Sequence, residues 1–140
     1  MRSIKKNTDA NKANAKNVEI YDSVTEIDDR AFFSCESLTS ITLGNSVTRI
    51  GSNSFHYCIG LTSITIPASI TSIHMYAFVN CSNLASVTML NSSKKLSIGN
   101  TAFEGISYSA KLYVPSNLLS EYQADSKWTG AFKGGIFAIQ

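Results

Sequence analysis

A 23-residue repeat limits what this chain can fold into more than any other feature. Three consecutive units span residues 24–46, 47–69 and 70–92. Each unit holds a marker isoleucine (Ile27, Ile50 or Ile73), and apolar residues recur at fixed offsets after it. Phenylalanine stands at +5, cysteine at +8 and leucine at +11, with Ile or Val at +14 and Leu, Ile or Met at +16. One unit is too small to bury its own apolar face, so the repeat predicts units that stack on one another.

The two halves of a unit carry different patterns. From +11 to +16, apolar residues alternate with Ser and Thr, as in the sequence LTSITL, which predicts a strand with its hydroxyl side chains outward. The stretch from +1 to +10 shows no alternation, and we expect it to return across the other side as a turn of α- or 3₁₀-helix. Strands at the same offset then lie side by side in a parallel sheet.

The register continues beyond the three full units. Val18 and Ile20 stand 23 residues before Ile41 and Leu43, so a half-unit precedes the first full one. A looser fourth unit begins at Ile98, after two extra residues that predict a loop bulge near residues 92–95. The sequence therefore predicts an α/β solenoid of four to five coils over residues 17–115.

The two ends are predicted to differ from this body. Residues 1–16 hold five Lys or Arg and one Asp and have little to bury, so we expect a disordered leader. Residues 116–140 are predicted to cap the solenoid with a helix near 117–124, N-capped by Ser116, and a strand near 135–139. The cap's apolar residues are Leu118, Leu119, Tyr122, Trp128, Phe132, Ile136 and Ile139. The other end lacks a comparable cap, so exposed Val18 and Ile20 are kept as a candidate homodimer contact.

Several classes of protein are disfavoured by composition. No run approaches 18 consecutive apolar residues, so no membrane span is predicted. No apolar h-region follows Met1, so the chain as given shows no signal peptide. The basic residues of the leader form only a short arm, and we predict no nucleic-acid partner.

The repeating unit carries a family resemblance. The pattern I-x-x-x-x-F-x-x-C-x-x-L-x-x-I-x-L/I over residues 17–115 resembles the BspA-like class of leucine-rich repeats, found in surface proteins of bacteria and protozoa. The tail LYVPSNLLSEYQADSKW is similar to the ending of some members. The resemblance implies a short right-handed solenoid with a parallel sheet on one face. It also implies a secreted or surface-attached protein that serves adhesion or host binding, without enzymatic activity.

The cysteines and histidines are the first candidates for chemistry. Cys35, Cys58 and Cys81 recur at +8, which predicts a ladder of buried thiols, with a disulfide as the alternative. Their spacing does not fit the closely spaced cysteine pairs of metal sites, so we predict no metal and no cofactor. His56 stands two residues before Cys58, and a cysteine-dependent enzyme using this pair is the catalytic alternative. The inward position of Cys58 argues against it.

The outward strand positions are the candidate binding surface. Six hydroxyl residues at +13 and +15, with two further residues on the last strand, would form a flat ladder: Ser40, Thr42, Ser63, Thr65, Ser86, Thr88, Lys111 and Tyr113. Thr favours exposed strands for purely structural reasons. The functional interpretation is a neutral surface that binds a host or cell-surface protein or glycan. Two alternatives stay open: a binding face formed by His56, Tyr57 and Tyr76, and a spacer or self-assembly module.

The absence of charged residues from the middle of the chain supports the stacked arrangement. Residues 50–93 contain no Asp, Glu, Lys or Arg at all. Like charges repeated every 23 residues would lie about 5 Å apart in adjacent coils and repel. Ser, Thr and Asn repeat without that cost, so the low charge is itself a prediction of in-register stacking.

Overall fold

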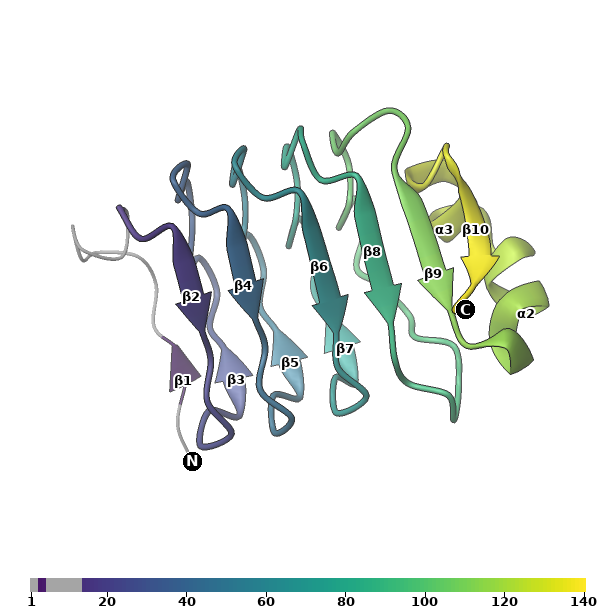
Figure 1. Cartoon of the computed structure of the whole chain (residues 1–140), viewed down its shortest axis with the longest axis horizontal. Coiled ribbons are helices and arrows are strands. Elements are labelled where there is room, and N and C mark those ends of the chain that lie inside the picture. Colours follow the sequence, from purple (N-terminus) through teal and green to yellow (C-terminus); the bar gives the residue numbers. More distant parts are fainter. Residues whose placement is uncertain (1–2, 5–13) are drawn as a thin grey trace.

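The computed structural model describes residues 3–4 and 14–140, which form a stack of coils closed at one end by helices (Figure 1). Long strands line one side of the stack: β2 (Asn17–Glu19), β4 (Ser40–Thr42), β6 (Ser63–Ile66), β8 (Ser86–Met89), β9 (Lys111–Val114) and β10 (Gly135–Ala138). Two-residue strands line the other side: β1 (Ser3–Ile4), β3 (Glu26–Ile27), β5 (Arg49–Ile50) and β7 (Ser72–Ile73). The helical elements are η1 (Ser116–Leu118), α2 (Leu119–Gln123) and α3 (Ser126–Ala131).

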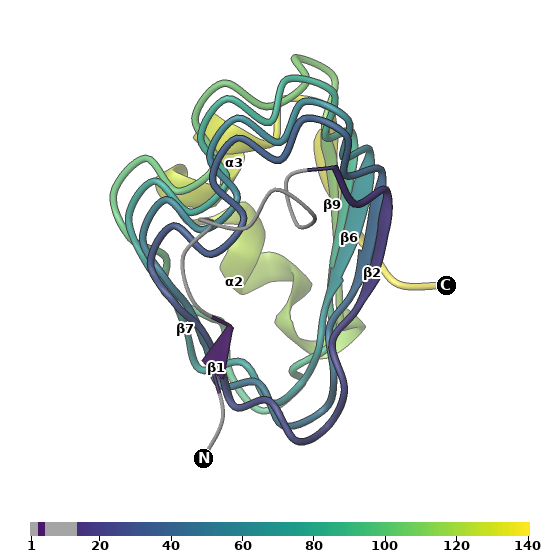
Figure 2. The same cartoon turned by 90° about the vertical axis from the view of Figure 1, so that its left-hand side faces the viewer.

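All strand pairs are parallel, and those between successive coils keep the predicted register. Ser63 pairs with Ser86 and Ile27 pairs with Ile50, each 23 residues apart. Parallel strands occur on both sides of the coil, whereas the sequence predicted a sheet on one side only (Figure 2). The second ladder is short because each marker isoleucine contributes a strand of only two residues, too short to show an alternating pattern.

The N-terminal strand departs from the expected leader. Most of the segment predicted to be disordered, residues 1–16, lies outside the described residues. Within it, however, Ser3–Ile4 form β1, which pairs with β3 in the same 23-residue register. Ile4 is therefore a marker isoleucine. The repeat pattern does not reveal it, because Asp9 and Lys12 occupy the offsets where other units have Phe and Cys.

The returning half of each coil is built from turns, not from the helical turn predicted. A left-handed backbone recurs in it at +3 and +7 after Ile27, Ile50, Ile73 and Ile98. The non-glycine residues, with φ between 54 and 63°, are Arg30, Ser34, Asn53, Tyr57, Tyr76, Asn80 and Thr101; Gly105 follows with φ 78°. Because few of these residues are the usual Gly or Asn, the sequence gives little sign of this conformation.

The hydrogen bonds between the turns of neighbouring coils all run in one direction along the stack. Amide N–H groups at +3, +5 and +7 donate to carbonyls at +2, +4 and +6 of the following coil, with N···O distances of 2.7 to 3.4 Å. Phe32 thus donates to Ser54, Phe55 to Ala77, and Phe78 to Ala102. We call this arrangement the turn ladder. Its N–H groups all point toward the C-terminal end of the stack, unlike a β-sheet edge, which presents both donors and acceptors.

An aromatic column forms the centre of the core. The rings of Phe32, Phe55, Phe78 and Phe103 stack nearly parallel, with centroids 5.3, 5.0 and 5.0 Å apart. Offset stacking of this kind contributes about 0.5–1.5 kcal/mol per pair beyond the burial of area. The phenylalanine at +5 of each predicted unit thus contributes one ring to a continuous column.

The cap closes this column. Trp128 and Phe132 pack against Phe103 at centroid distances of 5.8 and 5.1 Å. Both backbone polar groups of Leu96 are satisfied by buried cap side chains: its N–H donates to the Tyr122 hydroxyl, and its carbonyl accepts from the Trp128 indole, both at 3.0 Å. The predicted helix and final strand are therefore present, and Trp128 and Phe132 are buried as expected.

Details of the cap differ from the prediction. Ser116 does not N-cap, because Pro115 precedes η1 and no side chain closes it. A second helix, α3, was not predicted; the Asp125 carboxylate begins it by accepting from the Lys127 N–H at 3.0 Å. Leu119 is half-buried and Ile139 is exposed, so neither joins the buried core.

The candidate dimer contact at the other end is not supported. Ile20 is buried and Val18 is half-buried, so together they present no exposed apolar patch.

The aromatic column makes a first prediction. Replacing Phe55, which is fully buried between two rings, by Ala should lower the free energy of unfolding by about 3–5 kcal/mol, because large aromatic deletions leave a cavity. Urea denaturation measures the loss. Tyr108→Ala is the matched control, since Tyr108 is 83% exposed and its loss should cost under about 0.5 kcal/mol. Equal losses would show that Phe55 does not occupy the core.

The cap makes a prediction on pH. An ion pair with Lys95, together with the Lys127 N–H, lowers the pKa of Asp125 below that of an ordinary carboxyl, despite an opposing effect of burial. The stabilisation is present above the unfolded pKa near 4 and is lost as pH falls through the folded pKa. Thermal unfolding from pH 7 to pH 2 should therefore show Asp125→Asn losing less stability on acidification than the unmodified chain. Asn at this position still N-caps the helix, so the variant removes the ion pair alone. Equal losses of stability on acidification in the variant and the unmodified chain would contradict the role of the ion pair.

Candidate binding surface

The outward side chains of the long strands form one continuous face. Ser40, Thr42, Ser63, Thr65 and Lys111 are exposed, whereas Ser86, Thr88 and Tyr113 are intermediate. Apolar residues alternate with them and point into the core, as Ile64 and Ile66 do. We call this surface the long-strand face. It carries all eight residues predicted from the sequence.

Strand register brings these residues into rows. In one row Ser63, Ser86 and Lys111 are successive partners, and in the next row Thr65, Thr88 and Tyr113 are. Asn17 and Glu19 flank Ser40 and Thr42 in the same way on β2 and β4. Ser40 donates its hydroxyl proton to the Asn17 amide oxygen at 2.6 Å, which uses part of its hydrogen-bonding capacity.

The rows are interrupted between β4 and β6. These strands belong to different sheets, and no backbone hydrogen bond joins them in the described part of the chain. Pro67 contributes to the break, because it lacks the N–H that Leu90 donates to Ile66 at the same position one coil later.

A shallow cavity of about 320 Å³ lies over this break. Ser40 and Thr42 line one side of it, and Ser63 and Thr65 line the other. Four of the predicted residues therefore converge on one groove, while the other four lie on strands beyond it. The sequence could not reveal the groove, because the repeat predicts equal spacing between all coils.

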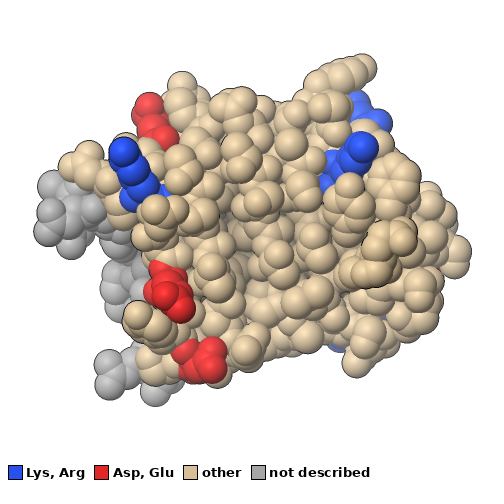
Figure 3. Space-filling view, viewed as in Figure 1, with Lys and Arg blue, Asp and Glu red and all other residues tan. Residues whose placement is uncertain are grey.

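The face is nearly free of charge. Figure 3 shows an uncharged expanse over the centre of the stack, with Lys, Arg, Asp and Glu gathered near its two ends. This matches the absence of charged residues between positions 50 and 93. Such a surface offers hydrogen bonds without long-range attraction, so ligand affinity must come from many contacts.

Aromatic residues extend the face at its C-terminal edge. Tyr113 lies beside Phe137 of β10, with ring centroids 6.0 Å apart, and the Lys111 ammonium lies 5.8 Å from the Phe137 ring centroid. Phe137 is 42% exposed and was not among the predicted residues. Phe137 alternates with the buried Ile136 in the sequence GIFA, and this alternation predicts an outward position for Phe137.

The alternative binding residues lie on the turn ladder. Tyr57 and Tyr76 are exposed, in agreement with the alternative, whereas His56 is half-buried. The His56 ring packs against Phe33 with centroids 4.8 Å apart. Burial and the nearby Arg30 guanidinium lower the pKa of His56, which favours the neutral imidazole.

The cysteines form the predicted ladder of buried thiols. Cys58 donates to the Phe32 carbonyl at 3.1 Å, and Cys81 donates to the Phe55 carbonyl at 2.9 Å. The neighbouring Cys81 thiol and burial both raise the pKa of Cys58. A nucleophilic thiol needs the opposite conditions, a lowered pKa and access to solvent, so this geometry does not favour the Cys58–His56 enzyme.

Metal ligands do not gather in the described residues, where no group of three or more His, Cys, Asp or Glu could hold an ion. Over the same residues, no helix is both long and apolar enough to cross a membrane.

Comparison with known proteins identifies the repeat. A model of the BspA type leucine-rich repeat region matches residues 2–124 in six copies. The chain belongs to the BspA-type leucine-rich repeat family. The match begins before residue 17, which agrees with the extra strand β1. No curated protein and no solved structure matches the chain.

Membership supports a general role. BspA-type repeat proteins are typically surface or extracellular, and they are generally non-enzymatic. A binding or structural role is therefore consistent with the family, as is the solenoid-like α/β arrangement of parallel strands.

The thiol ladder makes a prediction on reactivity. Iodoacetamide should leave Cys35, Cys58 and Cys81 unmodified in the native chain and modify all three in guanidinium, because each is fully buried. Tandem mass spectrometry of chymotryptic peptides measures modification at each site. Rapid native labelling of Cys58 alone would contradict the core ladder and revive the enzyme alternative.

Proposed function

We propose that the chain is a non-enzymatic recognition module that binds a protein or glycan of a host or cell surface through the long-strand face. The observation that carries the proposal is the groove between β4 and β6, where Ser40, Thr42, Ser63 and Thr65 converge. Family membership is consistent with a binding role, and it supports a secreted or surface-attached location.

The chemistry of the groove favours a neutral polar ligand. Hydroxyl groups donate and accept hydrogen bonds, so they suit sugar hydroxyls and peptide amides alike. Exposed Phe137 beside Tyr113 adds apolar contact area farther along the face.

A structural role is the second candidate. The continuous aromatic column and the inter-coil ladders give the stack the rigidity that a spacer needs. A spacer requires no hydroxyl side chain on the long-strand face. Variants that remove the hydroxyls therefore separate the two candidates.

The hydroxyl groups make the decisive prediction. Replacing the three threonines of the face by valine keeps shape and strand propensity but removes the hydrogen bonds; the substitutions are Thr42→Val, Thr65→Val and Thr88→Val. Capture of ligands from a glycan array, and of host surface proteins by immobilised chain, should fall by about ten-fold or more, since each lost hydrogen bond costs about 0.5–1.5 kcal/mol.

Glutamate at the same three positions should abolish capture by adding charge to a neutral face. The matched control places glutamate at exposed serines away from the face: Ser82→Glu, Ser97→Glu and Ser120→Glu. Circular dichroism checks that each variant is folded. Capture that survives in the folded valine and glutamate variants would rule out the long-strand face, and a folded chain that captures nothing from either source would favour the spacer.

A further inference from the structure

The turn ladder ends in donors without acceptors. Thr101, Phe103 and Gly105 occupy +3, +5 and +7 of the last coil, where the same N–H groups in three earlier coils each reach a carbonyl of the next coil. Thr101 and Gly105 keep the left-handed backbone of those coils, so their N–H groups keep the same direction. None of the three has a hydrogen-bond acceptor among the described residues.

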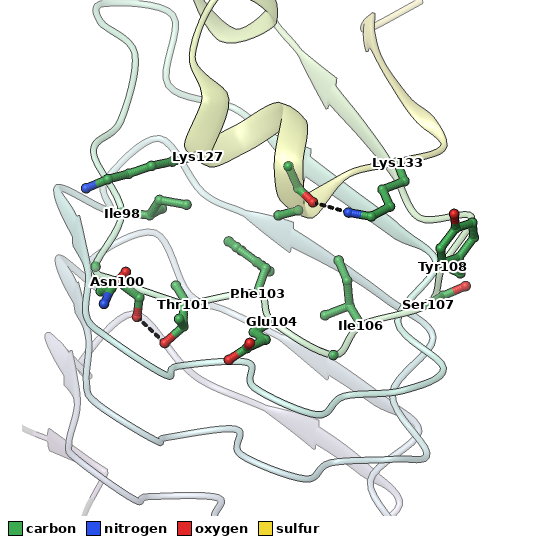
Figure 4. Close-up of a pocket in the computed structure, with 15 residues that line it drawn as sticks. Ile98, Asn100, Thr101, Phe103, Glu104, Ile106, Ser107, Tyr108, Lys127 and Lys133 are labelled. Carbon is green, nitrogen blue, oxygen red and sulfur yellow. Dashed lines mark hydrogen bonds between the residues drawn. The ribbon is translucent and has the colours of Figure 1, made fainter.

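These donors face a cavity. A hollow of about 470 Å³ lies between residues 98–108 and α3, and it is the larger of the two described in this chain. Figure 4 shows Phe103 and Ile106 directed toward α3, with Lys127 and Lys133 along the opposite side of the hollow. The cap covers the Phe103 ring but supplies no carbonyl to the ladder's last donors.

The cavity is electropositive for two independent reasons. The peptide groups of the turn ladder are aligned, and aligned N–H groups place partial positive charge at the end they point to, as at the N-terminus of a helix. Lys127 and Lys133 add two cations, against the single carboxylate of Glu104. Lys133 also donates to the Gly130 carbonyl at 2.8 Å, which holds its ammonium near the cavity.

The spacing of the donors selects the kind of ligand. Three N–H groups at alternate residues match three main-chain carbonyls that also stand at alternate residues, which is what each following coil presents to the one before it. A single small anion meets only part of this row. A peptide segment that adopts the turn backbone of the coils meets all of it, and acidic side chains on that peptide pair with the two lysines.

From this geometry we infer that the C-terminal end of the turn ladder is a binding site for an acidic peptide segment of a partner protein. The peptide's carbonyls accept from Thr101, Phe103 and Gly105, and its carboxylates lie against Lys127 and Lys133. The site is distinct from the long-strand face, so it does not depend on the function proposed above.

The test uses a defined probe and reports on the donors directly. A fluorescein-labelled nonapeptide of alternating Glu and Ser is titrated into the full chain, with a Lys-Ser peptide and sodium sulfate as comparison ligands. Fluorescence anisotropy gives the affinity, and ¹⁵N NMR follows the three amide signals. We expect the acidic peptide to bind and to shift the signals of Thr101, Phe103 and Gly105 together.

Variants locate the site. Lys127→Ala and Lys133→Ala should each weaken the acidic peptide by about ten-fold or more, as expected for a lost charge-assisted hydrogen bond. Gly130→Glu should abolish binding, because a Cβ at Gly130 meets no atom within 4 Å and the added carboxylate projects from the cavity wall. Lys94→Ala, which removes an exposed lysine outside the cavity, is the matched control and should bind normally, as should Thr65→Val.

Five results would overturn the inference. Absence of binding, or shifts confined to other amides, would show that the donors are not a site. Equal effects of sulfate on the same three signals would show a simple anion site, and equal binding of the Lys-Ser peptide would remove the role of charge. Concentration-dependent dimerisation in light scattering, lost in Gly130→Glu, would identify a second copy of the chain as the occupant.

Discussion

The structure depends on the approach of equivalent residues in neighbouring coils to about 5 Å, as the spacing of the Phe column shows. At this distance identical apolar side chains stack, and identical backbone groups form hydrogen bonds along the axis. The same distance forbids ladders of like charge, because such charges would repel in each adjacent pair. Residues 50–93, which form the middle of the stack, accordingly contain no charged side chain.

This constraint also shapes the surfaces available for binding. A neutral hydroxyl face follows from stacking itself, so hydroxyl composition alone does not distinguish recognition from structural necessity. Local departures from the repeat are more informative. The sheet is broken between β4 and β6, and the last N–H groups of the turn ladder have no acceptor among the described residues. Both departures leave main-chain groups without the inter-coil hydrogen bonds that regular stacking makes elsewhere.

Features fixed by side-chain periodicity were predictable from the sequence. The Phe column, the thiol ladder, the long strands and their outward residues all follow from the 23-residue spacing. β1 was missed because polar Asp9 and Lys12 hide the unit that Ile4 begins. Features set by backbone conformation were also missed, since left-handed φ at Arg30 or Tyr57 has no sequence signature comparable to glycine. Pro67, whose absent N–H contributes to the break between β4 and β6, stands at a position that the repeat pattern does not distinguish from the others.

The central claim is that the stacked coils form hydrogen bonds in one direction along the stack. Native-state hydrogen exchange tests this claim most directly. The account predicts that the amides of Phe55 and Phe78, which donate to the next coil, exchange slowly, whereas the amide of Phe103 exchanges much faster although its ring occupies the same column. Equal protection of all three amides would contradict the directional ladder and the open donors at its end.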